Sequence, residues 1–74
     1  MRVPSADEVS KLIAEYAGIR PAPADDPVAQ VEAALFIEDI FGLSLTDDDM
    51  TTERLGTFEA VERLVLARLA ERRR

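Results

Sequence analysis

Apolar residues recur at the spacing of one helical face in three stretches of the sequence, over residues 6–17, 27–41 and 57–69. In each stretch an apolar side chain returns every three or four residues, which is the period of an amphipathic helix. No segment has the alternation that predicts a strand, so we expect an all-helical fold arranged as an up-and-down bundle. The residues expected to face its core are Val9, Leu12, Ile13, Tyr16, Val31, Ala34, Leu35, Ile37, Ile40, Phe41, Phe58, Val61, Leu64, Val65 and Leu69.

Polar residues and glycines mark where these helices begin and end. Ser5 and Glu8 have the spacing of a capping box, in which each side chain accepts a hydrogen bond from the other residue's backbone N–H. Asp26-Pro27 supplies an N-cap carboxylate and a proline at the first position of the second helix. Gly18 and Gly42 stand where a left-handed residue would end the first and second helices.

The segments between the long helices carry prolines and short capping motifs. Residues 19–24 contain two prolines and predict a stiff, extended connector. Residues 43–45 alternate like an extended linker that places two leucines in the core. Residues 46–50 predict one short turn, and Thr52 is expected to cap a second that ends at Leu55. Residues 70–74 are predicted to be a basic, frayed tail.

The composition limits the chemistry available to this chain. Its 74 residues are enough for one domain, residues 1–74, with no room for a second core. Cysteine and histidine are absent, so thiol nucleophiles, the usual general base and the usual zinc ligands are missing. We therefore expect that the protein is not an enzyme, and that it has no catalytic residue, no metal and no cofactor.

The charge balance favours a protein partner over the other classes. The net charge of -6 repels a phosphate backbone and suits a partner with a basic patch. No stretch approaches the roughly 20 apolar residues that span a bilayer, and the first ten residues lack the order of a signal peptide. We expect a cytoplasmic protein with no nucleic-acid and no membrane partner.

Two groups of carboxylates are candidate sites, and each has a simpler interpretation. Asp47, Asp48 and Asp49 lack the alternating pattern and the glycine of a calcium loop, which favours a solvated helix start. Glu38 and Asp39 are adjacent on a helix and so about 100° apart, which is poor geometry for a shared metal. They are interpreted as part of a charged face.

The order of residues from Pro27 onward resembles the acyl and peptidyl carrier protein family. The most specific part is residues 36–50, FIEDIFGLSLTDDDM, followed by TERL at 52–55 and TFEAV at 57–61. The resemblance implies an acyl-carrier-protein-like bundle of three long helices plus a short third helix. It also implies that the second helix presents acidic positions to basic patches on partner enzymes.

In that family a phosphopantetheine arm is attached to a serine at the start of the second helix, fourteen residues before the phenylalanine that is Phe41 here. Counting back reaches Pro27, which has no hydroxyl, although Asp26 and Val28 match the flanking positions. The resemblance therefore implies a non-catalytic interaction module that is not phosphopantetheinylated and that binds, scaffolds or regulates enzymes of polyketide, fatty acyl or nonribosomal peptide biosynthesis. Its expected partner-binding residues are Val28, Glu32, Leu35, Glu38 and Asp39.

Two alternatives remain open from the sequence. The chain is then either a genuine acyl or aminoacyl carrier that is loaded in an unusual way, or an unrelated small helical adaptor. The connector over residues 19–26 is shorter than the first loop usual in the carrier family.

Overall fold

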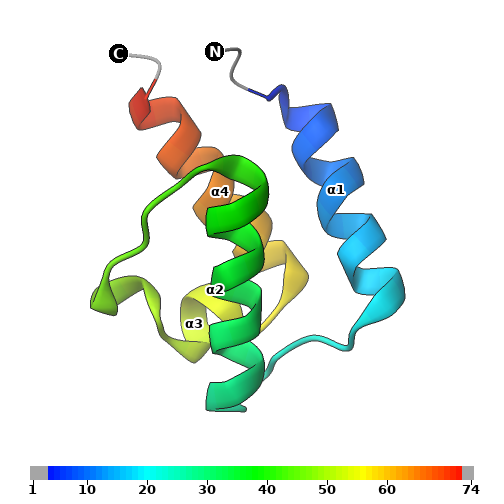
Figure 1. The fold of residues 1–74 in the computed structure, drawn as a ribbon, viewed down its shortest axis with the longest axis vertical. Helices are drawn as coiled ribbons and strands as arrows, with labels where there is room; N and C mark the ends of the chain where they lie inside the picture. The colour runs from blue at the N-terminus through cyan, green and yellow to red at the C-terminus, as the bar shows by residue number, and fades with distance from the viewer. Residues whose placement is uncertain (1–3, 73–74) are drawn as a thin grey trace.

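The computed structural model describes residues 4–72, and Figure 1 shows their arrangement. Its α-helices are α1 (Ala6–Ile19), α2 (Pro27–Phe41), α3 (Thr52–Leu55) and α4 (Phe58–Arg72). One 3₁₀ turn, η1 (Asp47–Asp49), precedes α3. No strand occurs within residues 4–72, which confirms the predicted all-helical class with three long helices and a short one.

The directions of the long helices differ from the prediction. Figure 1 shows α2 and α4 running in the same direction and α1 in the opposite one. The up-and-down arrangement is therefore wrong for the last helix. The reason is the connection over residues 42–57, which carries η1 and α3 and returns the chain to the end of the molecule where α2 began. Both α1 and α3 pack against α4, and α3 also contacts α2.

The first helix begins as predicted and ends later. The Ser5 hydroxyl accepts from Glu8 N–H at 3.2 Å, and Glu8 Oε1 accepts from Ser5 N–H at 3.3 Å, so the capping box is confirmed. The helix continues past Gly18, which does not adopt a left-handed conformation, and ends at Ile19. Arg20 is extended because it precedes Pro21, and a residue before proline avoids the helical region.

The second helix has the predicted bounds. The Asp26 carboxylate caps it by accepting from Val28 N–H at 3.0 Å and from Ala29 N–H at 3.4 Å. Pro27 occupies the first turn, where its missing N–H costs no hydrogen bond. Gly42 ends the helix in the left-handed conformation, with φ at 66°.

The last helix is longer than predicted. Residues 70–72 belong to α4 and do not form a frayed tail, while residues 73 and 74 of the predicted tail lie outside the described part. Arg72 Nη1 lies 3.4 Å from the Phe41 carbonyl oxygen and 3.2 Å from that of Gly42, and donates to both. These contacts hold the final turn of α4 against the end of α2 and satisfy carbonyls that the helix leaves free.

The short third helix is capped by Thr51 and not by Thr52. The Thr51 hydroxyl accepts from Arg54 N–H at 3.2 Å. The Thr52 hydroxyl instead accepts from the amide of Gln30 at 2.9 Å, which links α3 to α2. Gln30 is buried, and its amide also donates to the Ala24 carbonyl at 2.6 Å.

The core lies between the inward faces of the three long helices, α3 and the linker after α2. It confirms most predicted positions, but Val31, Leu35 and Ile40 are 47%, 58% and 47% exposed. Among residues 4–72 no other element covers the outer side of α2, so only one face of this largely apolar helix is buried. Buried members of the core are Val9, Ile13, Ala34, Ile37, Phe41, Leu43, Leu55, Val61, Leu64, Val65 and Leu69, with Leu12, Phe36, Leu45, Met50, Phe58 and Leu66 partly buried around them.

Candidate interaction surface

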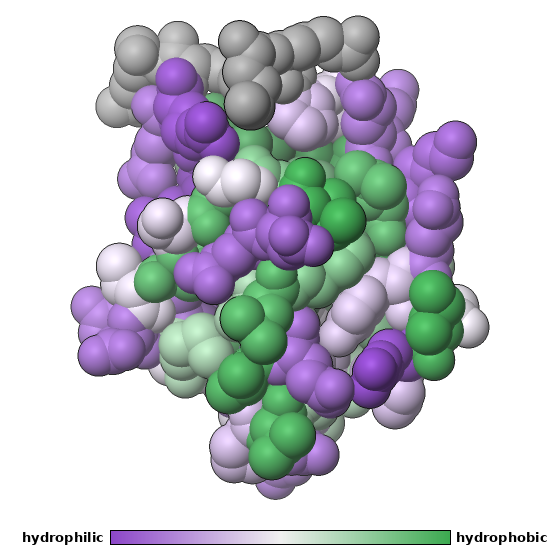
Figure 2. Space-filling model, in the orientation of Figure 1, coloured by the Kyte–Doolittle hydropathy of each residue, from purple (hydrophilic) through white to green (hydrophobic). Residues whose placement is uncertain are grey.

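The outer face of α2 carries a row of exposed aliphatic side chains. Val28 is 70% exposed, and Val31 and Leu35 follow it at 47% and 58%. They are three and four residues apart in turn, which places them on one side of the helix. We call these three residues the α2 stripe. In Figure 2, α2 lies at the front, and apolar side chains are exposed along it.

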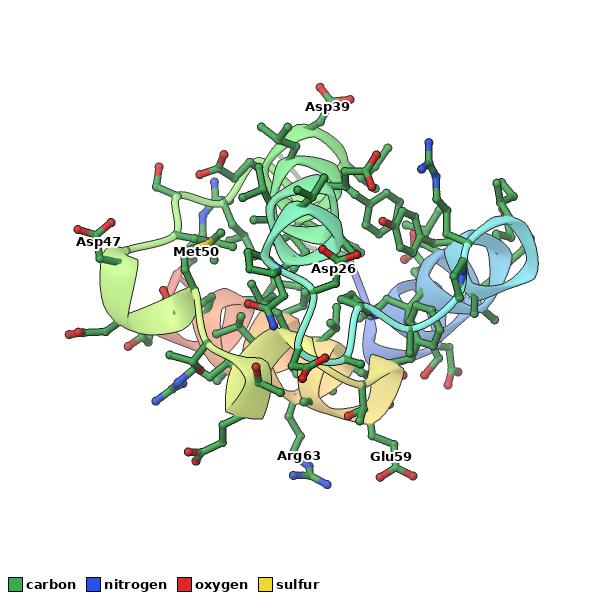
Figure 3. The ribbon with its side chains drawn as sticks, turned by 90° about the horizontal axis from the view of Figure 1, so that it is seen from below. Asp26, Asp39, Asp47, Met50, Glu59 and Arg63 are labelled. Atoms are coloured by element: carbon green, nitrogen blue, oxygen red, sulfur yellow. The ribbon has the colours of Figure 1, made fainter. Side chains whose placement is uncertain are left out.

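Carboxylates flank the α2 stripe. Glu32 is half exposed and pairs with Arg20, with Glu32 Oε2 and Arg20 Nη1 3.0 Å apart. Glu38 is exposed, and its Oε2 accepts from Leu45 N–H at 3.3 Å. Asp39 is exposed and points away from the bundle in Figure 3. The structure therefore brings Glu38, Asp39 and the stripe to one outward surface, while Glu32 is partly neutralised within the chain.

Aromatic rings of α1 and α2 pack against one another on the inner side of α2. The rings of Tyr16 and Phe36 are 4.4 Å apart between centroids, and Phe36 packs edge-on against Phe41 at 6.1 Å. Burial raises the pKa of Tyr16; the Arg20 charge opposes this effect and the Glu32 charge adds to it. These contacts make the aromatic residues part of the packing, as predicted, and they fix the orientation of the outer face of α2.

The position matched to the carrier attachment site holds no nucleophile. Pro27 is exposed at the first turn of α2, beside the capping carboxylate of Asp26. The hydroxyls of Thr46, Thr51 and Thr57 make local hydrogen bonds within the connection and at the start of α4. Ser44 is exposed on the linker after α2.

Asp49 was predicted to lie in a solvated helix start, and this prediction is wrong. It is 1% exposed, whereas Asp47 and Asp48 are exposed as predicted. Arg68 Nη2 donates to both carboxylate oxygens, at 2.7 and 2.8 Å, and Thr46 N–H donates to Oδ2 at 3.0 Å. Burial raises the pKa of the Asp49 carboxyl, but the hydrogen bonds from Thr46 and Arg68 and the Arg68 charge outweigh it, so that this pKa lies below its usual value of 3.8.

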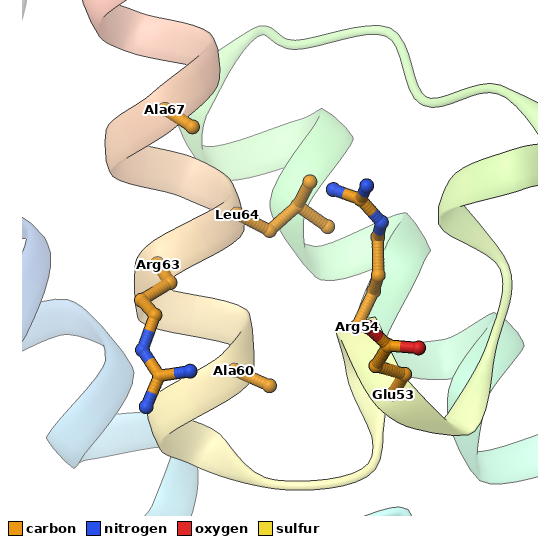
Figure 4. Close-up of a pocket in the computed structure, with 6 residues that line it drawn as sticks. All are labelled: Glu53, Arg54, Ala60, Arg63, Leu64 and Ala67. Carbon is orange, nitrogen blue, oxygen red and sulfur yellow. The ribbon is translucent and has the colours of Figure 1, made fainter.

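A groove of about 440 Å³ lies between α3 and α4, on a surface that sequence reasoning did not consider. Figure 4 shows Arg54 on the α3 side of this groove and Arg63 on the α4 side, with Ala60, Leu64 and Ala67 along α4. Glu53 adds one carboxylate at its edge. We call it the α3–α4 groove, and its lining residues are Glu53, Arg54, Ala60, Arg63, Leu64 and Ala67.

Other classes of site receive no support from the described residues. Within residues 4–72, no three histidine, cysteine, aspartate or glutamate side chains are grouped so that they could hold a metal ion. None of the helices in this part of the chain is both long enough and apolar enough to cross a membrane. Comparisons with protein-family models, with curated proteins and with solved structures find no match to this chain. The geometry of α2 is therefore the main guide to function.

Proposed function

We propose that this chain is a non-catalytic, acyl-carrier-protein-like interaction module that docks on a biosynthetic enzyme through α2. The observation that carries the proposal is the exposure of Val28 and Leu35 on the same helix face as Glu38 and Asp39. Aliphatic side chains beside carboxylates suit a partner surface that combines an apolar pocket with lysine or arginine. The order of elements, with a short helix between the second and last long helices, agrees with the carrier-like arrangement.

The two parts of this surface contribute differently to binding. An exposed ion pair contributes about 0 to 1 kcal/mol. Burying a fully exposed valine or leucine contributes about 1.5 to 3 kcal/mol, and these side chains are only partly exposed, so roughly 1 to 2 kcal/mol each is available before the cost of association. The α2 stripe therefore supplies most of the affinity. The carboxylates orient the partner and speed its approach.

The chain binds its partner without a covalently attached arm, because proline stands where the attachment serine is expected. Pro27→Ser should fold normally, since serine is also accepted at a helix start. Coexpression of the parent chain with a promiscuous phosphopantetheinyl transferase, followed by intact-mass measurement, separates the proposed interaction module from a genuine carrier. An unchanged mass of the parent chain agrees with the proposal, whereas a gain of one phosphopantetheine arm would establish the alternative of a genuine carrier.

Charge reversal at α2 tests the docking surface. The double variant Glu38→Lys with Asp39→Lys should slow association with biosynthetic enzymes encoded beside this chain, as measured by surface plasmon resonance at two salt concentrations. The matched control is Asp47→Lys with Asp48→Lys, which changes the net charge equally but lies on η1. Equal effects of the two pairs, or no binding by the parent chain, would contradict the proposal.

A further inference from the structure

The two arginines of the α3–α4 groove are exposed, and the ion pairs that the structure gives them are long. Arg54 and Arg63 have 51% and 80% of their side chains exposed. The carboxylates paired with them are distant, since Asp49 lies 4.0 Å from Arg54 and Glu59 lies 3.7 Å from Arg63. The exposed Arg63–Glu59 pair is weak. Arg54 is loosely paired, because the Asp49 carboxylate is held at shorter distance by Arg68. An external carboxylate that enters the groove would therefore replace only weak ion pairs within the chain.

The other described basic residues are less suited to this role. Arg20 pairs with Glu32 at 3.0 Å, and Arg68 pairs with buried Asp49 at 2.7 Å. Arg72 donates to two carbonyl oxygens at the end of α2. Lys11 is exposed on α1 with acidic residues four positions before and after it on the same helix side.

The groove and the outer face of α2 have complementary chemistry. The groove is lined by Leu64 and two alanines of α4, with the guanidinium groups of Arg54 and Arg63 and the one carboxylate of Glu53 beside them. The outer face of α2 has an aliphatic row with Glu38 and Asp39 beside Leu35. The two surfaces lie on opposite sides of the molecule, because Asp39 and Arg63 point in opposite directions in Figure 3. A contact between them has to join two copies of the chain.

We propose that copies of this chain associate head to tail, with the α2 stripe of one copy in the α3–α4 groove of the next. A symmetric contact between two α2 faces is disfavoured because it would bring their carboxylates together. A pair of copies joined by the proposed contact keeps one free α2 stripe and one free α3–α4 groove, so the assembly extends as an open chain. The net charge of -6 keeps it weak. The contact uses the same α2 face as the proposed enzyme partner, so the two bind in competition.

Two variants, each blocking one surface, make this proposal testable by sedimentation velocity. The average mass of the parent chain should rise between about 10 µM and about 1 mM. Leu35→Glu blocks α2 and Arg63→Glu blocks the groove, and each should lower the association constant by about tenfold or more. An equimolar mixture of the two should form dimers that grow no further, because one intact surface of each kind remains.

The control is Lys11→Glu, which makes the same charge change on α1 and should leave association unchanged. Circular dichroism checks that all variants remain helical. The proposal is overturned if the parent is monomeric at every concentration, if either blocking variant associates like the parent, if the mixture stays monomeric, or if Lys11→Glu weakens association as much as Arg63→Glu. Binding of the Arg63→Glu variant to the enzyme, measured at a dilution where the parent chain is monomeric, tests the proposed function separately.

Discussion

Replacing Asp49 by alanine should destabilise the fold much more than a change at its neighbours in η1. The carboxylate is 1% exposed and accepts both hydrogen bonds from Arg68, at 2.7 and 2.8 Å, and one from Thr46 N–H. Removing one partner of a fully buried ion pair costs roughly 3 to 5 kcal/mol. The Arg68 side chain is 30% exposed and can partly regain water, so we expect a loss of about 2 to 4 kcal/mol.

The free energy of unfolding from urea denaturation, followed by circular dichroism, measures this loss. For a domain of this size, each kcal/mol also lowers the melting temperature by about 4 to 8 °C. Asp48→Ala is the matched control, because Asp48 lies in the same turn but is exposed, and it should change stability by less than about 0.5 kcal/mol. Equal losses for Asp48→Ala and Asp49→Ala would refute the assigned role of the Arg68 contact.

The Asp49 carboxylate also makes the stability of the fold depend on pH. The pKa of Asp49 is lower in the folded chain than its usual value of 3.8, so the folded state favours the ionised form. Its contribution to stability is therefore complete well above pH 3.8 and is lost as the pH falls through the folded-state pKa. The difference in unfolding free energy between the parent and Asp49→Asn should be constant near neutral pH and should shrink as the pH falls below 3.8. A difference that stays the same in acid would contradict the assignment.

Further changes test the core, the caps and the glycines by urea denaturation. Phe41→Ala should cost about 3 to 5 kcal/mol, because the ring is 5% exposed, and a loss below about 1 kcal/mol would disprove its burial. Gly56→Ala should cost roughly 1 to 3 kcal/mol, since its Cβ would lie 2.4 Å from the Thr52 carbonyl oxygen. Gly18→Ala meets no atom within 4 Å and should instead stabilise α1 by about 0.5 to 1 kcal/mol; a gain in stability for Gly56→Ala or a loss for Gly18→Ala would be inconsistent with this packing. Asp26→Ala should cost about 1 kcal/mol by removing the α2 cap, and no loss would show that the cap contributes little.

Helix positions followed from local signals, and the errors came from a competing local signal in one case and from a long-range contact in another. The capping box at Ser5 and the Asp26-Pro27 start act within a few residues, so they can be predicted from sequence. At the end of α1, the constraint imposed by Pro21 on Arg20 decided the boundary, and Gly18 did not. The last turn of α4 depends on Arg72 reaching the end of α2, a contact between distant segments that periodicity does not report.

The candidate site was predictable in part. Periodicity identifies an apolar face but does not show whether another element covers it, so Val31 was assigned to the core alone and Leu35 to both the core and the partner-binding face. The α2 stripe therefore contains Val31 in addition to the predicted Val28 and Leu35. The burial of Asp49 depends on Arg68, nineteen positions away in sequence. One signal was available, because Arg68 falls on the buried side of α4 with Leu64 and Val65.

Amide chemical shifts of the isotope-labelled chain, recorded during titration with an unlabelled biosynthetic enzyme encoded beside it, test most directly whether α2 is the docking face. The labelled chain is kept dilute enough to remain monomeric. We predict that the largest shifts fall on residues 28–39 and that they disappear in the double variant Glu38→Lys with Asp39→Lys. Shifts confined to α1, or to α3 and α4, with α2 unchanged at saturation, would contradict the proposed function.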